Sequence, residues 1–310
     1  MWKRIFEYQI TEDTLKTKDT RNIHEFLKAH GYSSGVIRHL KETQNGICKN
    51  GVWARVHESL LPGDTLTILL TEESSSQNIV PSPLPLNIVY EDVDLLVINK
   101  PAGMPIHPSQ GNFDNTLANA CAWYFEQKNE PFTYRCINRL DRDTTGLLII
   151  ARHMYSASLL SCMVAKREIH REYRAVVEGL LPEDGIIDAP IARREGSTIE
   201  REVNFKTGEP ARTHFRRLAS DISPIDQKKY SLASINLESG RTHQIRVHMK
   251  HIGYPLPGDF LYNPNYSVIK RQALHSYRLT FCHPVTGKQM DFISPLPEDM
   301  LITQKFREAI

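Results

Sequence analysis

Apolar residues near the start of the chain follow two different spacings, and each spacing predicts a different element. Alternating apolar positions between Ile5 and Ile10 predict a short strand. Between Ile23 and Gly31 the apolar residues are three and four apart, which predicts a helix that ends at the glycine. The chain therefore opens with a strand followed by a helix.

A second helix and a hairpin complete a small unit that ends near residue 70. Ser33 or Ser34 can cap a helix over the residues that follow, with a basic outer side. The side chains expected to face inward from this helix are Val36, Ile37 and Leu40. Asn50-Gly51 is a dipeptide typical of tight hairpin turns, and an apolar run over 65–70 predicts a further strand.

Residues 73–86 are rich in serine, glutamate and proline and show no apolar periodicity, which is typical of a linker. We therefore predict a small domain over residues 1–72 and a larger domain over residues 87–310.

Strands and helices follow one another in the larger domain without a fixed order. Apolar patterns predict strands over 87–90, 94–99, 171–178 and 230–237. Helical spacing predicts helices over 116–124, 155–166 and 242–251, and we interpret residues 219–230 as a polar insertion. Because no steady strand–helix–strand rhythm is present, we predict an α+β fold with a mixed, largely antiparallel sheet flanked by helices.

The composition indicates which partners and which cellular compartment are compatible with the chain. The 310 residues carry a formal net charge of +2, so a nucleic-acid partner has to be attracted by local basic clusters. Candidate tracts contain Lys166, Arg167, Arg171, Arg174, Arg193, Arg194 and Arg201. Five cysteines with no Cys-x-x-Cys spacing favour free thiols in a reducing compartment and disfavour a thiolate zinc site. No apolar run approaches the roughly 20 residues of a membrane span, so we expect a cytoplasmic protein without a membrane anchor.

One stretch, residues 138–150, combines a polar turn with a buried strand. Residues 138–146 read Asn-Arg-Leu-Asp-Arg-Asp-Thr-Thr-Gly and are rich in turn formers, whereas 147–150 form a continuous apolar run. Two arginines and two carboxylates are thus held in a loop directly against a core strand, as functional groups often are. The alternative at this point is a purely structural turn in which Asp141 and Asp143 bond backbone N–H groups.

This stretch resembles the signature of the RluA-type pseudouridine synthases, which usually reads His-Arg-Leu-Asp followed by a Thr/Ser-Gly turn. Further blocks of the resemblance occur in the expected order over about residues 87–300, at 97–104 with His107-Pro108, 171–179, 240–249 and 257–259. One departure is Asn138, which stands where the family usually has histidine, so no argument that needs an ionisable group applies there.

The resemblance implies a pseudouridine synthase catalytic domain that isomerises uridine in RNA without a cofactor or metal. Asp141 matches the catalytic aspartate, which acts at the sugar as a nucleophile or as a base. Arg246 matches the arginine that orients this carboxylate, and Tyr173 matches the aromatic residue on which the flipped base stacks. Tyr173 alternates with Ala175 and Val177, so a plain core tyrosine is its alternative interpretation.

Four further residues are implied to bind substrate. Arg139 matches the arginine that enters the RNA helix where the uridine has left, and Ile245 is expected to close the other face of the base. His107 and Arg241 are expected to contact phosphate or substrate edges, with Arg241 acting beside a helix N-terminus.

Residues 1–72 resemble the alpha-L RNA-binding module of the ribosomal protein S-four type, which often precedes this catalytic domain. For that reason we expect ribosomal RNA, most of all large-subunit RNA, as the partner, with transfer RNA as the alternative. A monomer suffices for this chemistry.

Two other functions are weighed against this interpretation. His243, His248 and His251 are candidate ligands of a metal-dependent hydrolase, although no carboxylate or thiolate block accompanies them. A non-catalytic RNA-binding or ribosome-assembly protein is the other alternative, and the retained residues Asp141 and Arg246 argue against it.

Overall fold

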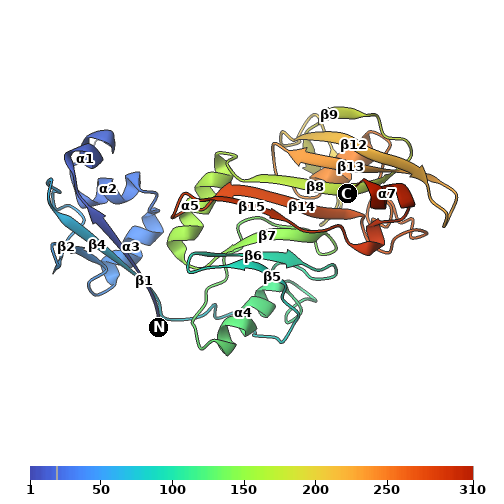
Figure 1. Cartoon of the computed structure of the whole chain (residues 1–310). Helices are drawn as coiled ribbons and strands as arrows, with labels where there is room; N and C mark the ends of the chain where they lie inside the picture. Colours follow the sequence, from blue (N-terminus) through green and yellow to red (C-terminus); the bar gives the residue numbers. More distant parts are fainter. Residues whose placement is uncertain (19, 310) are drawn as a thin grey trace.

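The structure, a computed structural model, describes residues 1–18 and 20–309. Its N-terminal elements are β1 Trp2–Gln9, α1 Glu12–Lys18, α2 Ile23–Ala29, α3 Ser34–Glu42, β2 Ile47–Lys49, β3 Val52–Trp53 and β4 Thr65–Glu72. They form a four-stranded antiparallel sheet in the order β1-β4-β2-β3, with the helices packed on it at one end of the molecule (Figure 1).

The predicted first strand is present as β1, whereas helix α1 was not predicted. Tyr8 and Ile10, two of the apolar residues on which the strand was predicted, pack in the module's core. Ile5, the third, lies on the outer face of β1 and is 62% exposed. Ser33 caps α3 by accepting a hydrogen bond from the Val36 N–H, as expected from the serine signal.

The larger domain contains the remaining elements. They are β5 Ile88–Glu91, β6 Leu95–Lys100, α4 Leu117–Gln127, β7 Thr145–Ala151, α5 Met154–Ala165, β8 His170–Glu178, β9 Asp184–Asp188, β10 Ile191–Arg193, β11 Arg201–Val203, β12 Arg212–Ile222, β13 Lys229–Leu237, α6 Gln244–His251, β14 Leu274–Cys282, β15 Gln289–Ile293, the 3-10 helix Glu298–Met300 and α7 Gln304–Glu308. The main sheet has the order β5-β6-β7-β14-β8-β13-β12-β9, with β15 beside β14. Only the β7–β14 pair is parallel among the described strands, so the predicted α+β class with a largely antiparallel sheet is confirmed.

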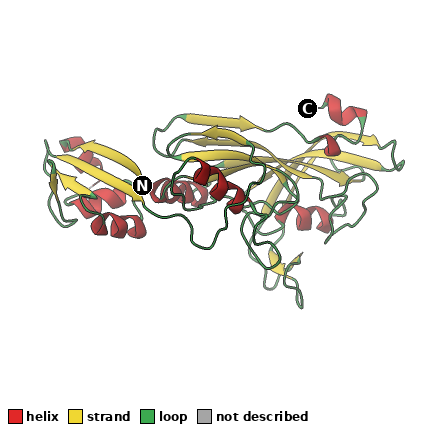
Figure 2. Cartoon of the chain, turned by 90° about the horizontal axis from the view of Figure 1, so that it is seen from below, coloured by secondary structure: helices red, strands yellow, loops and turns green. Residues whose placement is uncertain are grey.

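Helices cover both faces of this sheet, and β7 supplies apolar side chains to each face. Leu148 and Ile150 pack with α4 and α6 on one side. Leu147 and Ile149 pack with α5 on the other side, which explains why the run 147–150 is continuously apolar. Figure 2 shows the long strands as one twisted layer, set apart from the strands and helices of the N-terminal module.

The predicted polar insertion at 219–230 is wrong in its first part. Residues up to Ile222 continue β12, and only 223–228 form a loop. Strand β9 pairs with β12 only as far as Arg216, so the rest of β12 is an edge with one neighbour, β13. An edge strand can carry polar residues, and that is why the pattern did not look like a strand.

The N-terminal module packs directly against α5. The Tyr155 ring stacks on Tyr32 with a centroid distance of 3.9 Å, and the Tyr155 hydroxyl donates to the His30 carbonyl at 2.9 Å. On the other side of this contact, Arg4 and His153 both bond the buried carboxylate of Asp94, at 3.2 and 2.9 Å. The two parts of the chain therefore share buried polar and aromatic contacts.

The segment 73–86 has no helix or strand, but hydrogen bonds attach it to the larger domain. The Ser76 N–H donates to the Phe132 carbonyl at 3.2 Å, and the Phe132 N–H donates to the Ser75 hydroxyl at 3.1 Å. Farther along, the Ser82 N–H donates to the Asn119 carbonyl at 3.2 Å. This segment is an ordered strap across α4 and the residues that follow it.

Candidate active site

The loop of residues 138–146 is shaped by its polar side chains and by its glycine. The Asn138 side-chain carbonyl accepts the Ile149 N–H at 2.9 Å, and the Thr144 N–H closes the turn on the Asp141 carbonyl at 3.1 Å. Gly146 has a φ of +107°, and a Cβ there would lie 2.2 Å from the Ser276 carbonyl oxygen. The close parallel pairing of β7 with β14 therefore requires glycine at this position.

A buried lysine ties the loop to the strand beside it. Lys100 ends β6 and is 1% exposed, and its ammonium donates to the carbonyls of Pro101, Met104 and Arg142 at 2.7, 2.9 and 2.7 Å. Burial lowers the pKa of Lys100 to about 7, against the opposing charges of Asp143 and Asp141. Because Arg142 follows Asp141, these bonds fix the backbone next to the predicted catalytic carboxylate.

Arg246 lies between two carboxylates at the bottom of the site. Its Nη1 donates to Asp141 Oδ2 at 2.7 Å, while Nε and Nη2 hold the buried Asp259 through two bonds of 2.7 Å. Burial disfavours the charge on Arg246, but the bonds to Asp259 and the charge of Asp141 raise the pKa of the guanidinium. Among the described residues no hydrogen bond to Asp141 Oδ1 is recorded, which leaves this oxygen free to meet a substrate.

The predicted site residues gather around one hollow of about 360 Å³. Those that line it are Asp141, Arg246, Tyr173, Arg139, Ile245 and Arg241. Tyr173, on β8, is 4% exposed and forms part of the wall, so it is both a core residue and a lining residue. His107 does not line this hollow; it lies on a wider adjoining groove of about 1600 Å³ that also includes Asp141.

The three predicted RNA-contacting residues at the rim differ in whether their charged or polar groups already have a partner in the protein. Arg139 is exposed and has no ion-pair partner among the described residues. His107 is exposed next to it, and its pKa is lowered by partial desolvation and by the Arg139 charge. Arg241 forms an ion pair with Glu209 and donates to the Pro210 carbonyl at 3.3 Å, so it is not a free anion-binding group. The helix predicted from residue 242 begins only at Gln244.

Three residues of the site were not assigned to it by sequence reasoning. Asp259 was noticed only as part of a matching block, and Lys100 only as part of another. His243 was considered as a metal ligand, whereas its ring lies beside Asp141, with Nε2 3.9 Å from Oδ2. The role of Asp259 could have been suspected from the sequence. An aspartate without a basic neighbour in its short motif needs a cationic partner from elsewhere in the chain if it is buried.

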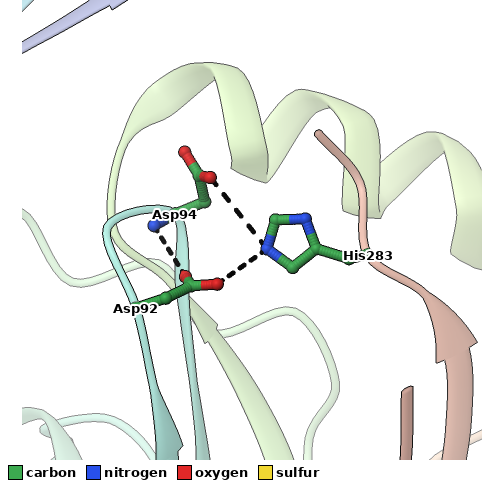
Figure 3. A group of neighbouring side chains, drawn as sticks. All are labelled: Asp92, Asp94 and His283. Atoms are coloured by element: carbon green, nitrogen blue, oxygen red, sulfur yellow. Dashed lines mark hydrogen bonds and ion pairs between the residues drawn. The ribbon is translucent and has the colours of Figure 1, made fainter. Parts of the chain in front are cut away.

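The histidines proposed as metal ligands do not come together. His248 is fully buried, and its two nitrogens contact the Thr213 hydroxyl at 2.9 Å and the Ala189 carbonyl at 2.8 Å. Within the described ranges, the one group of three possible ligand side chains is Asp92, Asp94 and His283, far from that helix in sequence (Figure 3).

The group in Figure 3 is explained by hydrogen bonds rather than by a metal. The N–H groups of Val285 and Thr286 point at His283 Nδ1, at 3.3 and 3.1 Å, so the ring proton is on Nε2. Nε2 donates this proton to Asp92 Oδ2 at 2.9 Å. A metal ion at Nε2 would require the proton on Nδ1, against two N–H donors, so these residues do not fit a metal site.

Comparison with known proteins identifies the family. The sequence profile described as RNA pseudouridylate synthase matches residues 94–251, and the chain belongs to this family. It is 38% identical over 279 residues to the uncharacterized RNA pseudouridine synthase YjbO of Bacillus subtilis, covering 90% of this chain and 96% of the relative. It is 41% identical over 242 residues to the ribosomal large subunit pseudouridine synthase D of Zymomonas mobilis, covering 73% of this chain and 74% of that relative.

Solved structures agree on the fold. The human RNA pseudouridylate synthase domain containing 1 superposes with a TM-score of 0.58 at 24% identity, covering 68% of this chain and 83% of that one. The protein is therefore an RNA pseudouridine synthase, an isomerase, and the predicted family is confirmed. No helix in the described part of the chain has the length and apolar character needed to cross a membrane.

Proposed function

We propose that this enzyme converts specific uridines of large-subunit ribosomal RNA to pseudouridine, with Asp141 as the carboxylate that acts on the ribose. The observation that carries the proposal is the position of Asp141 at a hollow lined by Tyr173, with its Oδ2 held by Arg246 and its Oδ1 unbonded within the described chain. The names of several relatives, including those from Zymomonas mobilis and Haemophilus influenzae, support the choice of large-subunit ribosomal RNA.

The reaction needs few chemical groups, and the hollow supplies them. The bond from uracil N1 to C1′ breaks, the base turns, and C5 bonds to C1′; C5 then loses its proton, and N1 gains one. Asp141 acts at the sugar as nucleophile or base, and Arg246 keeps it oriented. Tyr173 and Ile245 form apolar walls that hold the detached base.

The wider groove provides the contacts for the rest of the RNA. Arg139 stands at its edge as an unpaired cation within the described residues, suited to the space left by the extruded uridine. A neighbouring hollow of about 760 Å³ is lined by Arg201, Lys250 and His251 together with Glu202 and the ion pair of Arg194 with Glu200, and we assign its basic side chains that have no ion pair within the described chain to the RNA backbone. Arg38 and Arg55 are exposed on the N-terminal module, which we propose as a further RNA-binding domain.

We further propose that the enzyme is a monomer and acts in the cytoplasm, where free cysteines such as Cys162 and Cys282 stay reduced. Transfer RNA is the competing substrate, since the residues of the hollow recognise a uridine and not the RNA that contains it. Binding without catalysis is the second alternative, and the intact arrangement of Asp141 and Arg246 disfavours it.

Pseudouridine mapping of total RNA from cells with and without the protein tests the target. We expect the loss of one or more sites in large-subunit ribosomal RNA, and their return with the wild-type chain. Asp141→Asn, which keeps the shape and removes the charge, is expected to bind RNA without restoring the sites or releasing tritium from C5-labelled uridine. Loss of sites only in transfer RNA would overturn the target, and full activity of the variant would overturn the role of Asp141.

A further inference from the structure

We propose that His243 recognises the ribose 2′-hydroxyl of the target uridine, by donating its Nε2–H to the hydroxyl oxygen while the hydroxyl donates to Asp141. This inference rests on the proposed function and adds to it a residue that distinguishes RNA from DNA at the reacting nucleotide.

The protonated nitrogen of His243 follows from a chain of hydrogen bonds. The Arg201 backbone N–H donates to the Tyr262 hydroxyl oxygen at 2.8 Å. His243 Nδ1, 2.9 Å away, is the one acceptor for the hydroxyl's own proton among the hydrogen bonds of the described residues, so the hydroxyl donates to it. With Nδ1 acting as acceptor, the single proton of the neutral ring is on Nε2, the nitrogen that faces Asp141.

The ring is held in place by its backbone and its neighbours. His243 has a φ of +59°, a left-handed conformation that is uncommon for residues other than glycine and is found at many functional sites. The buried Gln244 fixes the turn, because its side-chain carbonyl accepts the Arg241 N–H and its amide donates to the Arg212 carbonyl, both at 3.0 Å. Burial lowers the pKa of His243, so the ring is neutral at physiological pH.

The distance between His243 and Asp141 fits a bridging hydroxyl. Nε2 lies 3.9 Å from Oδ2, which is too long for a hydrogen bond. An oxygen at normal hydrogen-bond distance from both atoms would be bonded at an angle of about 90°, which a hydroxyl accepts while also donating. Both side chains line the hollow that also contains Tyr173, so the bridging position is open to the substrate.

The 2′-hydroxyl is the substrate group that matches these two partners. It donates and accepts at once, it is next to the anomeric carbon on which Asp141 acts, and it is absent from DNA. The site offers an acceptor in Asp141 and a donor in His243, both within reach of one oxygen placed beside the pair. An apolar group or an ammonium group could not satisfy both.

A double-mutant cycle between protein and substrate tests the contact. Single-turnover rates are measured for wild type and His243→Ala on an RNA substrate and on the same RNA with one 2′-deoxyuridine at the target position. We expect His243→Ala to be slower than wild type by about 10-fold on the normal RNA, the worth of one hydrogen bond in a buried site. The missing hydroxyl should slow wild type by about 10-fold more than it slows His243→Ala, because only the bond to Asp141 is left to lose in the variant.

Two controls separate recognition from general damage. His170→Ala removes an exposed histidine at the start of β8, outside the hollow and the groove, and should keep the full 2′-hydroxyl discrimination. Tyr262→Phe keeps the ring but removes the hydroxyl that selects the tautomer, so it should reduce the discrimination.

Dissociation constants of wild type and His243→Ala for product RNA, with and without the 2′-hydroxyl on the pseudouridine, give a second measurement that does not depend on turnover. If the effect of His243→Ala and the effect of the missing hydroxyl are independent, so that the two factors multiply in both rate and Kd, the contact is refuted. If wild type forms no pseudouridine in any RNA, the proposed function fails instead.

Discussion

Replacing Arg246 by methionine should damage stability and catalysis for two separable reasons. The guanidinium is 1% exposed and makes three bonds of 2.7 Å, two to Asp259 and one to Asp141. Asp259 is itself fully buried, so the single variant leaves an uncompensated charge inside the protein. Breaking one side of such a buried pair costs about 3–5 kcal/mol of the free energy of unfolding.

The effect on catalysis comes from the third bond. A hydrogen bond between charged groups contributes about 1.5–3 kcal/mol, which corresponds to roughly 10- to 100-fold in rate if it orients Asp141 at the transition state. The double variant Arg246→Met with Asp259→Asn removes the buried charge as well. We expect it to recover much of the lost stability, because a neutral amide replaces the unpaired carboxylate, and to remain slow, because Asp141 still lacks its partner.

Urea unfolding and tritium release from C5-labelled uridine measure the two quantities on the same proteins. Asp259→Asn alone serves as the matched control, since it keeps the bond from Arg246 to Asp141. If activity returned in the double variant together with stability, Arg246 would be only a structural partner of Asp259, and the reasoning about Asp141 would be wrong.

Three further predictions use other parts of the structure. Gly146→Ala should prevent stable folding, because its Cβ would clash with the Ser276 carbonyl. Gly196 also has a positive φ but nothing within 4 Å of an added Cβ, so Gly196→Ala should reduce the free energy of unfolding by only about 1 kcal/mol. Thermal melting curves of the two variants test this difference. Burial lowers the pKa of His275 to about 4. Between about pH 6.5 and pH 4 the unfolded chain therefore binds more protons than the folded chain, and the free energy of unfolding decreases by up to about 3 kcal/mol as the pH is lowered. His275→Gln should flatten that dependence in urea titrations at pH 7 and 5, and an unchanged slope would contradict it. Arg139→Ala should leave stability unaltered, because the side chain is exposed, and should reduce single-turnover rates on structured RNA more than on an unpaired oligonucleotide.

Much of this site could be predicted because its residues lie in short contiguous blocks. Asp141 and Arg246 are 105 positions apart in the sequence, yet both were selected from local motifs, and the structure brings them to 2.7 Å. Local motifs cannot show which groups a side chain will bond in the folded protein. The roles of Asp259 and Lys100 are set by the groups that face them after folding. A lysine exposed to solvent and a buried lysine that donates to three carbonyls, as Lys100 does, look the same in a sequence.

The same limit explains the errors. The strand β1 was predicted, but which of its apolar residues are buried depends on the helices that pack on the sheet, and Ile5 lies on the outer face. His243 and His248 were both considered as metal ligands, and only the tertiary structure places one at Asp141 and the other between Thr213 and Ala189.

The strap of residues 73–86 changes what a cut in the chain would do. Protease cleavage there would divide the polypeptide without freeing either piece, because Tyr155 stacked on Tyr32 and the bonds of Asp94 would still hold the fragments together. The nicked enzyme should therefore run as one particle in gel filtration and as two bands under denaturing conditions. Evolution could then lengthen or change the strap while the N-terminal module keeps its position against α5.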